Sequence, residues 1–259
     1  MINKQKDLDK ITSLYSNSEG PKFVVIDELF ENDFIKKCEA EFLQINESDF
    51  IHYQNPLFEF EKFALNEREK MPQNIRSLFE YIHSKEFVEL INSITNIPDL
   101  SVDEKRWGGG LHMTKKGGYL SIHKDFNILP TTYKDQEQML RCVNLIGYLN
   151  SNWKEGDGGE LEFWDDKGNH SVEKIEPKFN RWVIFDTRNN YHGHPYPYQG
   201  ESHRISIASY YYTKIISDDK QWSSTEYLKL PWMEETDEYI KARQERADAK
   251  SRYKNILDK

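Results

Sequence analysis

The apolar positions of the first hundred residues recur mostly at helical spacing. A charged helix is expected over 1–17, before the apolar run 23–26, which reads as a short strand. Apolar residues then repeat every three to four positions over 31–45 and again over 73–94, which predicts two amphipathic helical stretches with one face on a core. We therefore expect the amino-terminal part of the chain to be mostly helical.

The pattern changes in the middle of the chain, where paired and tripled glycines separate short runs of aromatic and β-branched residues. Such runs are typical of strands, and their spacing favours a β-sandwich or a barrel. Beyond residue 216 the chain becomes polar, and mixed charges over 234–259 predict a solvated terminal helix. The strands are expected at about 119–123, 141–149, 160–164, 171–175, 181–186 and 204–213.

The composition indicates one soluble domain. Hydrophobic residues make up 37% of the 259 positions and aromatic residues 14%, which is enough to form a core and excludes a fully disordered chain. We expect a single domain with helical support over 1–100, a β core over 101–216 and a helical tail over 217–259. No window holds the roughly eighteen uncharged apolar residues that a membrane span needs, and the amino terminus lacks a secretory leader. A cytoplasmic protein is therefore expected.

Charge and cysteine content narrow the function classes further. Lysine and arginine number 35 against 44 aspartate and glutamate, so the net charge is −9, which argues against non-specific binding of nucleic acid. The two cysteines, Cys38 and Cys142, are too few for a disulfide scaffold or a thiolate metal cage. The candidate chemistry therefore lies with histidine, carboxylate and arginine side chains.

The first candidate is the pair His123 and Asp125, at the end of an expected strand. Residues two apart on a strand face the same side, so an imidazole and a carboxylate could bind one ion. With eight histidines in the chain, a surface pair at a strand end is the favoured interpretation of this motif taken alone.

The second candidate is His192-Gly193-His194, about seventy residues downstream. Either imidazole could complete a face of two histidines and one carboxylate, which in non-haem Fe(II) oxygenases leaves coordination positions open. A catalytic zinc site accepts the same ligands, so ligand identity alone does not decide the metal.

The third candidate is Arg204, which opens an expected strand. It shares one face with Ser206, Ala208 and Tyr210, and the two small residues, Ser206 and Ala208, leave room for an anion. A buried guanidinium is costly unless a carboxylate or phosphate engages it. An outward arginine paired with a surface carboxylate is the alternative.

The order of these motifs resembles the Fe(II)- and 2-oxoglutarate-dependent dioxygenases of the prolyl 4-hydroxylase-like superfamily. The similarity covers residues 108–213, including the segments RCVNLIGYLN, NWKEGDGGELEFW, EPKFNRWVIFD and HRISIASYYYT. It implies a mainly β, α+β fold, namely a double-stranded β-helix (a distorted, cupin-like jelly roll) flanked by helices. The collagen-type members carry lysine where this chain has Arg204, so the arginine-bearing branch is the more similar.

The resemblance also assigns roles to residues. It implies iron ligation by His123, Asp125 and His192, with His192 favoured over His194 because the ligand comes soon after the strand RWVIFD. It implies that Arg204 binds the distal carboxylate of 2-oxoglutarate and that Tyr148 donates a hydrogen bond to it. The residues expected to line the pocket are Asn144, Tyr210, Tyr119 and Arg141.

The implied activity is hydroxylation of a C–H bond, with succinate and CO₂ as coproducts. Fe(II), 2-oxoglutarate and O₂ are the implied cofactors and cosubstrates, and ascorbate is a reductant that such enzymes can use. The substrate is expected to be a small molecule or a peptidyl residue, recognised near a lid over 126–140. A catalytically silent jelly-roll module and a zinc hydrolase are the alternatives. The complete set of metal and anion residues argues against the first, and Arg204 and Tyr148 have no role in the second.

Overall fold

The computed structural model describes residues 2–3, 5–103, 108–129, 137–188, 190–216 and 223–247. The α-helices are α1 Leu8–Ser16, α2 Asn32–Phe42, α3 Gln73–Ile82, α4 Lys85–Thr95 and α5 Asp237–Ala247, with short 3₁₀ turns at Glu47–Asp49 and Arg68–Lys70. The strands are β1 Phe23–Asp27, β2 Ile51–Asn55, β3 Glu59–Leu65, β4 Ser101–Val102, β5 Gly110–Lys124, β6 Glu137–Tyr148, β7 Leu161–Trp164, β8 Ser171–Ile175, β9 Arg181–Asp186, β10 Tyr191–His194, β11 Arg204–Ile216 and β12 Glu226–Tyr227.

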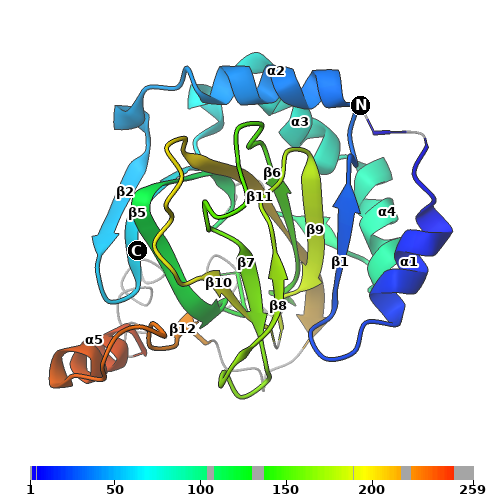
Figure 1. Ribbon diagram of the computed structural model, residues 1–259. Helices are drawn as coiled ribbons and strands as arrows, with labels where there is room; N and C mark the ends of the chain where they lie inside the picture. The colour runs from blue at the N-terminus through cyan, green and yellow to red at the C-terminus, as the bar shows by residue number, and fades with distance from the viewer. Residues whose placement is uncertain are drawn as a thin grey trace.

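The strands form one curled antiparallel sheet in the order β1-β9-β6-β11-β5-β10-β7-β8. The helices α1 to α4 lie at the top and right of Figure 1, whereas α5 lies at the opposite end beside β12. This arrangement confirms the predicted distorted jelly roll with flanking helices. Among the described residues, no helix has the length and apolar character that a membrane span requires.

The long strand β5 joins the two halves of the curled sheet. Its first half pairs with β11, from Gly110 to Thr114, and its last residues pair with β10 and β12. Gly117, with a φ of +83°, lies between these two halves, in a conformation that side chains with a Cβ rarely adopt. The bent strand therefore brings its carboxyl-terminal end, with His123, against β10.

Alternation along β9 separates two apolar layers. Trp182 and Ile184 belong to the large core shared with the helices, whereas Val183 and Phe185 belong to a second cluster with Tyr148 inside the curled sheet. Successive side chains of a strand point to opposite faces, so a single strand serves both layers. Helices therefore cover the outer face of this part of the sheet, and its inner face supports the site.

The amino-terminal region differs from the sequence prediction in three places. The helix expected over 1–17 begins at Leu8, and Ile2 forms a β-bridge with Phe30. The helical stretch expected over 73–94 is divided into α3 and α4, because the Ser84 side chain accepts a hydrogen bond from the Phe87 N–H and starts a new helix. Residues 51–65 form the hairpin β2–β3, in a region expected to be mostly helical. Its strands have no regular alternation of buried and exposed positions, so the pattern gave no strand signal.

The carboxyl-terminal helix α5 is largely exposed but is anchored at Tyr239. That ring is 1% exposed and packs with Phe58 and Tyr227. Part of the proposed lid over 126–140, residues 130–136, and the end of the tail, residues 248–259, lie outside the described residues.

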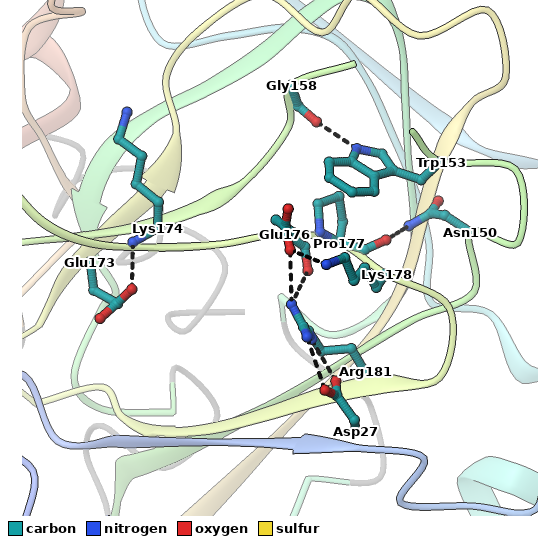
Figure 2. Close-up of polar contacts among 10 residues, drawn as sticks. All are labelled: Asp27, Asn150, Trp153, Gly158, Glu173, Lys174, Glu176, Pro177, Lys178 and Arg181. Atoms are coloured by element: carbon teal, nitrogen blue, oxygen red, sulfur yellow. Dashed lines mark hydrogen bonds and ion pairs between the residues drawn. The ribbon is translucent and has the colours of Figure 1, made fainter. Parts of the chain in front are cut away.

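Polar contacts hold the loops that lead to the site, as Figure 2 shows. Asn150 donates from Nδ2 to the Pro177 carbonyl at 2.8 Å, and its Oδ1 accepts from the Ile205 N–H at 2.6 Å. The Trp153 indole N–H donates to the Gly158 carbonyl at 2.9 Å. The loop that carries Gly158 and Gly159 is thereby fixed next to the start of β11.

Candidate active site

The structure brings His123, Asp125 and His192 together at one end of the curled sheet. One ligand atom from each lies within 4.8 Å of the others. His123 and His192 face each other as register partners on β5 and β10, and their ring centroids are 4.5 Å apart. Asp125 follows β5 directly, with carboxylate oxygens 3.8 Å from His123 Nε2 and 3.7 Å from His192 Nε2.

Backbone carbonyls orient both imidazoles. Nδ1 of His123 lies 2.9 Å from the Ser121 carbonyl, and Nδ1 of His192 lies 3.2 Å from the Asn190 carbonyl. A carbonyl oxygen only accepts, so Nδ1 carries the proton in each ring and Nε2 presents its lone pair to the space beside Asp125. This is the tautomer that metal ligation through Nε2 requires.

The electrostatics keep the cluster in its metal-binding protonation state. Burial, together with the neighbouring His192, lowers the pKa of His123 to about 4, and burial also lowers the pKa of His192. Burial raises the pKa of Asp125, but the Arg141 guanidinium and the hydrogen bond from Tyr210 oppose this effect, and the pKa lies below its usual value. Asp125 Oδ2 is buried and has no hydrogen-bond partner among the described residues. Two neutral imidazoles and an ionised carboxylate with a free oxygen fit a divalent metal ion.

Arg141 is fixed beside this carboxylate. Its guanidinium lies between the rings of Phe126 and Tyr210, 3.6 Å from each centroid, and donates to the Tyr212 hydroxyl at 3.0 Å. Nη1 lies 3.4 Å from Asp125 Oδ1, to which the Tyr210 hydroxyl also donates at 3.5 Å. Oδ1 is thus held by the protein, and Oδ2 is left for a ligand.

Arg204 lies inside the curled sheet, where it is 5% exposed. Nε donates to the Gly159 carbonyl at 2.7 Å, and Nη2 donates to the Tyr148 hydroxyl at 3.4 Å. A Cβ at Gly159 would lie 2.8 Å from Arg204 Cδ, so the backbone can approach this side chain only at a glycine. Among the described residues Arg204 has no carboxylate within 4.0 Å, a geometry that suits an anionic ligand.

One cavity of about 740 Å³ connects the metal cluster with Arg204. Of the other residues predicted from sequence, Asn144, Tyr210 and Arg141 line it, and Tyr148 lies behind Arg204 as a fully buried side chain. Tyr119 does not line it. Its hydroxyl donates to the Pro56 carbonyl at 2.7 Å and its ring stacks on Phe60, so the expected pocket role of Tyr119 is not seen.

Four further residues with acidic, basic or imidazole side chains line the same cavity and were not singled out as site residues from the sequence. They are Glu59, Lys62, His112 and Arg246, from β3, β5 and α5. His194 also lines the cavity, but outside the metal cluster, and its electrostatic neighbours include Arg204 and Lys62. No local motif marks these residues, because strand pairing and the docking of α5 bring them together.

Comparison with known proteins agrees with this geometry. Residues 107–212 match the family described as 2OG-Fe(II) oxygenase superfamily. No curated protein sequence matches the chain.

Solved structures show the same fold at low sequence identity. A prolyl-4-hydroxylase from Pseudomonas putida is 14% identical, over 80% of this chain and 99% of its own, with a TM-score of 0.57. A prolyl hydroxylase from Trichoplax adhaerens, in complex with a hypoxia inducible factor peptide fragment, is 20% identical, over 81% and 94%, with a TM-score of 0.56. HygX from Streptomyces hygroscopicus, with nickel, 2-oxoglutarate and hygromycin B bound, is 12% identical, over 79% and 86%, with a TM-score of 0.54.

These structures establish the architecture, and the family match covers the segment that carries the metal cluster and Arg204. The chain therefore has the fold of the prolyl 4-hydroxylases, and its segment 107–212, which carries the metal cluster and Arg204, is similar to the 2OG-Fe(II) oxygenase superfamily.

Proposed function

We propose that His123, Asp125 and His192 hold the Fe(II), and that Arg204 and Tyr148 bind the distal carboxylate of 2-oxoglutarate. The observation that carries this assignment is a cavity that joins three convergent ligand atoms to a buried arginine with no carboxylate within 4.0 Å in the described part of the chain. When bound, iron and cosubstrate supply the oxidising chemistry, in which 2-oxoglutarate gives succinate and CO₂ and one oxygen atom of O₂ enters a substrate C–H bond.

The protein's own contribution is binding and orientation. The Ser121 and Asn190 carbonyls fix the tautomers of the two histidines, so each Nε2 meets the metal unprotonated. Arg141, held between two rings, binds one oxygen of Asp125 and keeps the other turned toward the ion. No side chain needs to act as nucleophile, because the cofactor carries the reaction.

The substrate is a small molecule or a peptidyl residue that enters the same cavity. Both kinds of ligand are bound by proteins of this fold, since one similar structure holds a peptide fragment and another holds hygromycin B. Cys38 and Cys142 are both free thiols, which is typical of a reducing compartment and supports the cytoplasm as the site of action.

Anaerobic Fe(II) titration by calorimetry tests the ligand assignment. We expect Asp125→Ala and His192→Ala to weaken iron binding strongly, because each removes one ligand of the three. His194→Ala should still bind iron, since His194 lies outside the cluster. Loss of iron binding in His194→Ala with retention in His192→Ala would reverse the choice of histidine. Equal affinity in wild type and Asp125→Ala would refute the site itself.

A further inference from the structure

Two cations share one carboxylate in the wall of the cavity. Glu59, on β3, is 5% exposed and lies 3.2 Å from Lys62 Nζ through one oxygen and 3.2 Å from Arg246 Nη2 through the other. All three side chains line the cavity. The two cations and the one carboxylate together carry a net charge of +1.

A single aromatic ring separates the group formed by Glu59, Lys62 and Arg246 from the metal cluster. The Arg246 guanidinium stacks over Tyr227, 4.7 Å from its centroid, and the Tyr227 ring stacks on His123, with centroids 5.3 Å apart. Tyr227 and His123 are also register partners of β12 and β5. A ligand held by these cations therefore places its neighbouring atoms close to the iron.

The net charge of the whole cavity also favours an anionic ligand. Among the described residues its lining holds four cationic side chains, Lys62, Arg141, Arg204 and Arg246, against two carboxylates, Glu59 and Asp125. Iron as a dication and 2-oxoglutarate as a dianion cancel each other, so an excess of two positive charges remains after both have bound. This excess lies within a chain whose overall charge is −9. Buried charge of one sign is costly unless a ligand of the other sign accompanies it.

Two histidines add unsatisfied polar atoms to the same wall. His194 is 5% exposed, and its Nδ1 has no hydrogen-bond partner among the described residues; the same holds for Nε2 of His112. Lys62 and Arg204 are electrostatic neighbours of both rings. A buried polar nitrogen without a partner is unfavourable, and the oxygens of a bound acid would satisfy it.

We propose that the substrate is a small acid whose carboxylate or phosphate group binds Lys62 and Arg246, with the C–H bond to be hydroxylated directed toward the metal. The inference rests on the proposed function and specifies its substrate class. A small acid suits the site better than a peptide backbone, because Lys62 has a side-chain exposure of only 14% and its anionic partner must enter the cavity. The volume is in the range of sites for single metabolites.

The positions of these cations support a role in specificity. Glu59, Lys62 and Arg246 all lie outside residues 107–212, the segment that matches the superfamily, whereas the metal cluster and Arg204 lie inside it. The common chemistry and the substrate contact thus come from different parts of the chain.

The test uses the full chain with Fe(II), 2-oxoglutarate and ¹⁸O₂ on a small-molecule cell extract. Anion exchange divides the extract into retained acids and unretained neutral and basic compounds, and mass spectrometry locates the labelled product. One oxygen atom of ¹⁸O₂ enters succinate, so the diagnostic label is that in a second product, and we expect this product in the retained pool. Phosphatase treatment before fractionation distinguishes the two acids, because it moves a phosphate ester into the unretained pool and leaves a carboxylic acid retained. Label in neutral or basic compounds of the untreated extract, or in added protein, overturns the proposal.

Two variants with matched controls test the residues with the same acid pool. Arg246→Gln and Lys62→Met should each raise the concentration of acid needed for half-maximal product formation by about 10-fold or more, because each loses a charge-assisted contact. Arg243→Gln on the same helix, which pairs with Glu226 at 3.5 Å, and Lys115→Met, which pairs with Glu47, should leave it unchanged. Equal values in all five proteins overturn the proposal. If the proposed function itself is wrong, the wild-type protein will form no succinate from 2-oxoglutarate even with the unfractionated extract. This result is distinct from the failure of the substrate proposal alone.

Discussion

Replacement of Arg204 by glutamine tests most directly whether the cavity binds 2-oxoglutarate through its distal carboxylate. Arg204 is buried, and its two protein partners, the Gly159 carbonyl and the Tyr148 hydroxyl, are neutral. Nε is already used by Gly159, so Nη1 and Nη2 are the nitrogens that can face a bound carboxylate. Glutamine keeps a polar side chain of moderate length but removes the positive charge and this pair of donors.

The magnitude follows from burial. Truncation of one partner of a buried, hydrogen-bonded charge pair costs about 2–5 kcal/mol, and a value near 3 kcal/mol corresponds to a loss of ~10²-fold in affinity for 2-oxoglutarate. Arg204→Lys should recover only part of this loss, because an ammonium keeps the charge without the planar fork. Tyr148→Phe should cost about 1 kcal/mol or somewhat more, because one hydrogen bond disappears while the ring still packs.

The assay is the dependence of succinate formation on 2-oxoglutarate concentration, with Fe(II) affinity measured in parallel by calorimetry. Iron binding should survive in all three variants, since none of them changes a ligand. Arg188→Gln, a change of the same charge at a side chain that is 44% exposed, serves as the control. An unchanged half-saturating concentration in Arg204→Gln would refute the assignment of this arginine to the cosubstrate.

Two further predictions concern the surrounding fold. Burial and the nearby Lys62 lower the pKa of His112 to about 3, so this ring is neutral in the folded protein, whereas it gains a proton below about pH 6.5 once unfolded. The contribution of His112 to folding stability therefore rises with pH between about 4 and 6. In urea titrations of the metal-free protein, His112→Asn should reduce the slope of unfolding free energy against pH by up to about 1.4 kcal/mol per pH unit. An equal slope in the variant and the wild type would mean that the ring is charged in the folded protein. Gly147→Ala should lower the unfolding free energy by about 1–3 kcal/mol in the same assay, because its Cβ would lie 2.4 Å from the buried Trp182 ring; an unchanged midpoint would show that this ring can move.

The sequence was most informative where a motif is local. His123 and Asp125 are separated by a single residue, and the β-branched and aromatic runs of β6, β9 and β11 are long enough to predict strands. The distinction between His192 and His194 depends instead on strand register. His192 pairs directly with His123, whereas a register shift between the two histidines places His194 opposite Leu120. A bulge of this kind follows from the approach of two strands and leaves no signal in composition.

Prediction failed where a side chain's surroundings depend on distant segments. Tyr119 lies on the same strand as His123, and this proximity suggested a pocket residue. The Tyr119 ring stacks on Phe60 and its hydroxyl donates to the Pro56 carbonyl, and both partners belong to the hairpin β2–β3 and its turn. These contacts hold the side chain outside the cavity lining. Because the hairpin itself was not predicted, neither were its contacts.

The same hairpin and the terminal helix explain why sequence alone did not specify the substrate. Glu59, which also pairs with Lys62, pairs with Arg246 across 187 positions of sequence, and the docking of helix α5 brings the two side chains together. Tyr239 anchors that helix against Phe58 through one buried ring, while most of its other positions face solvent, so its charge pattern is that of a solvated tail. A helix held at so few points can still decide specificity, because Arg246 changes the net charge of the group Glu59, Lys62 and Arg246 from zero to +1. The chemistry of this protein is therefore encoded in short motifs of the core, whereas the choice of substrate depends on contacts between its two peripheral elements.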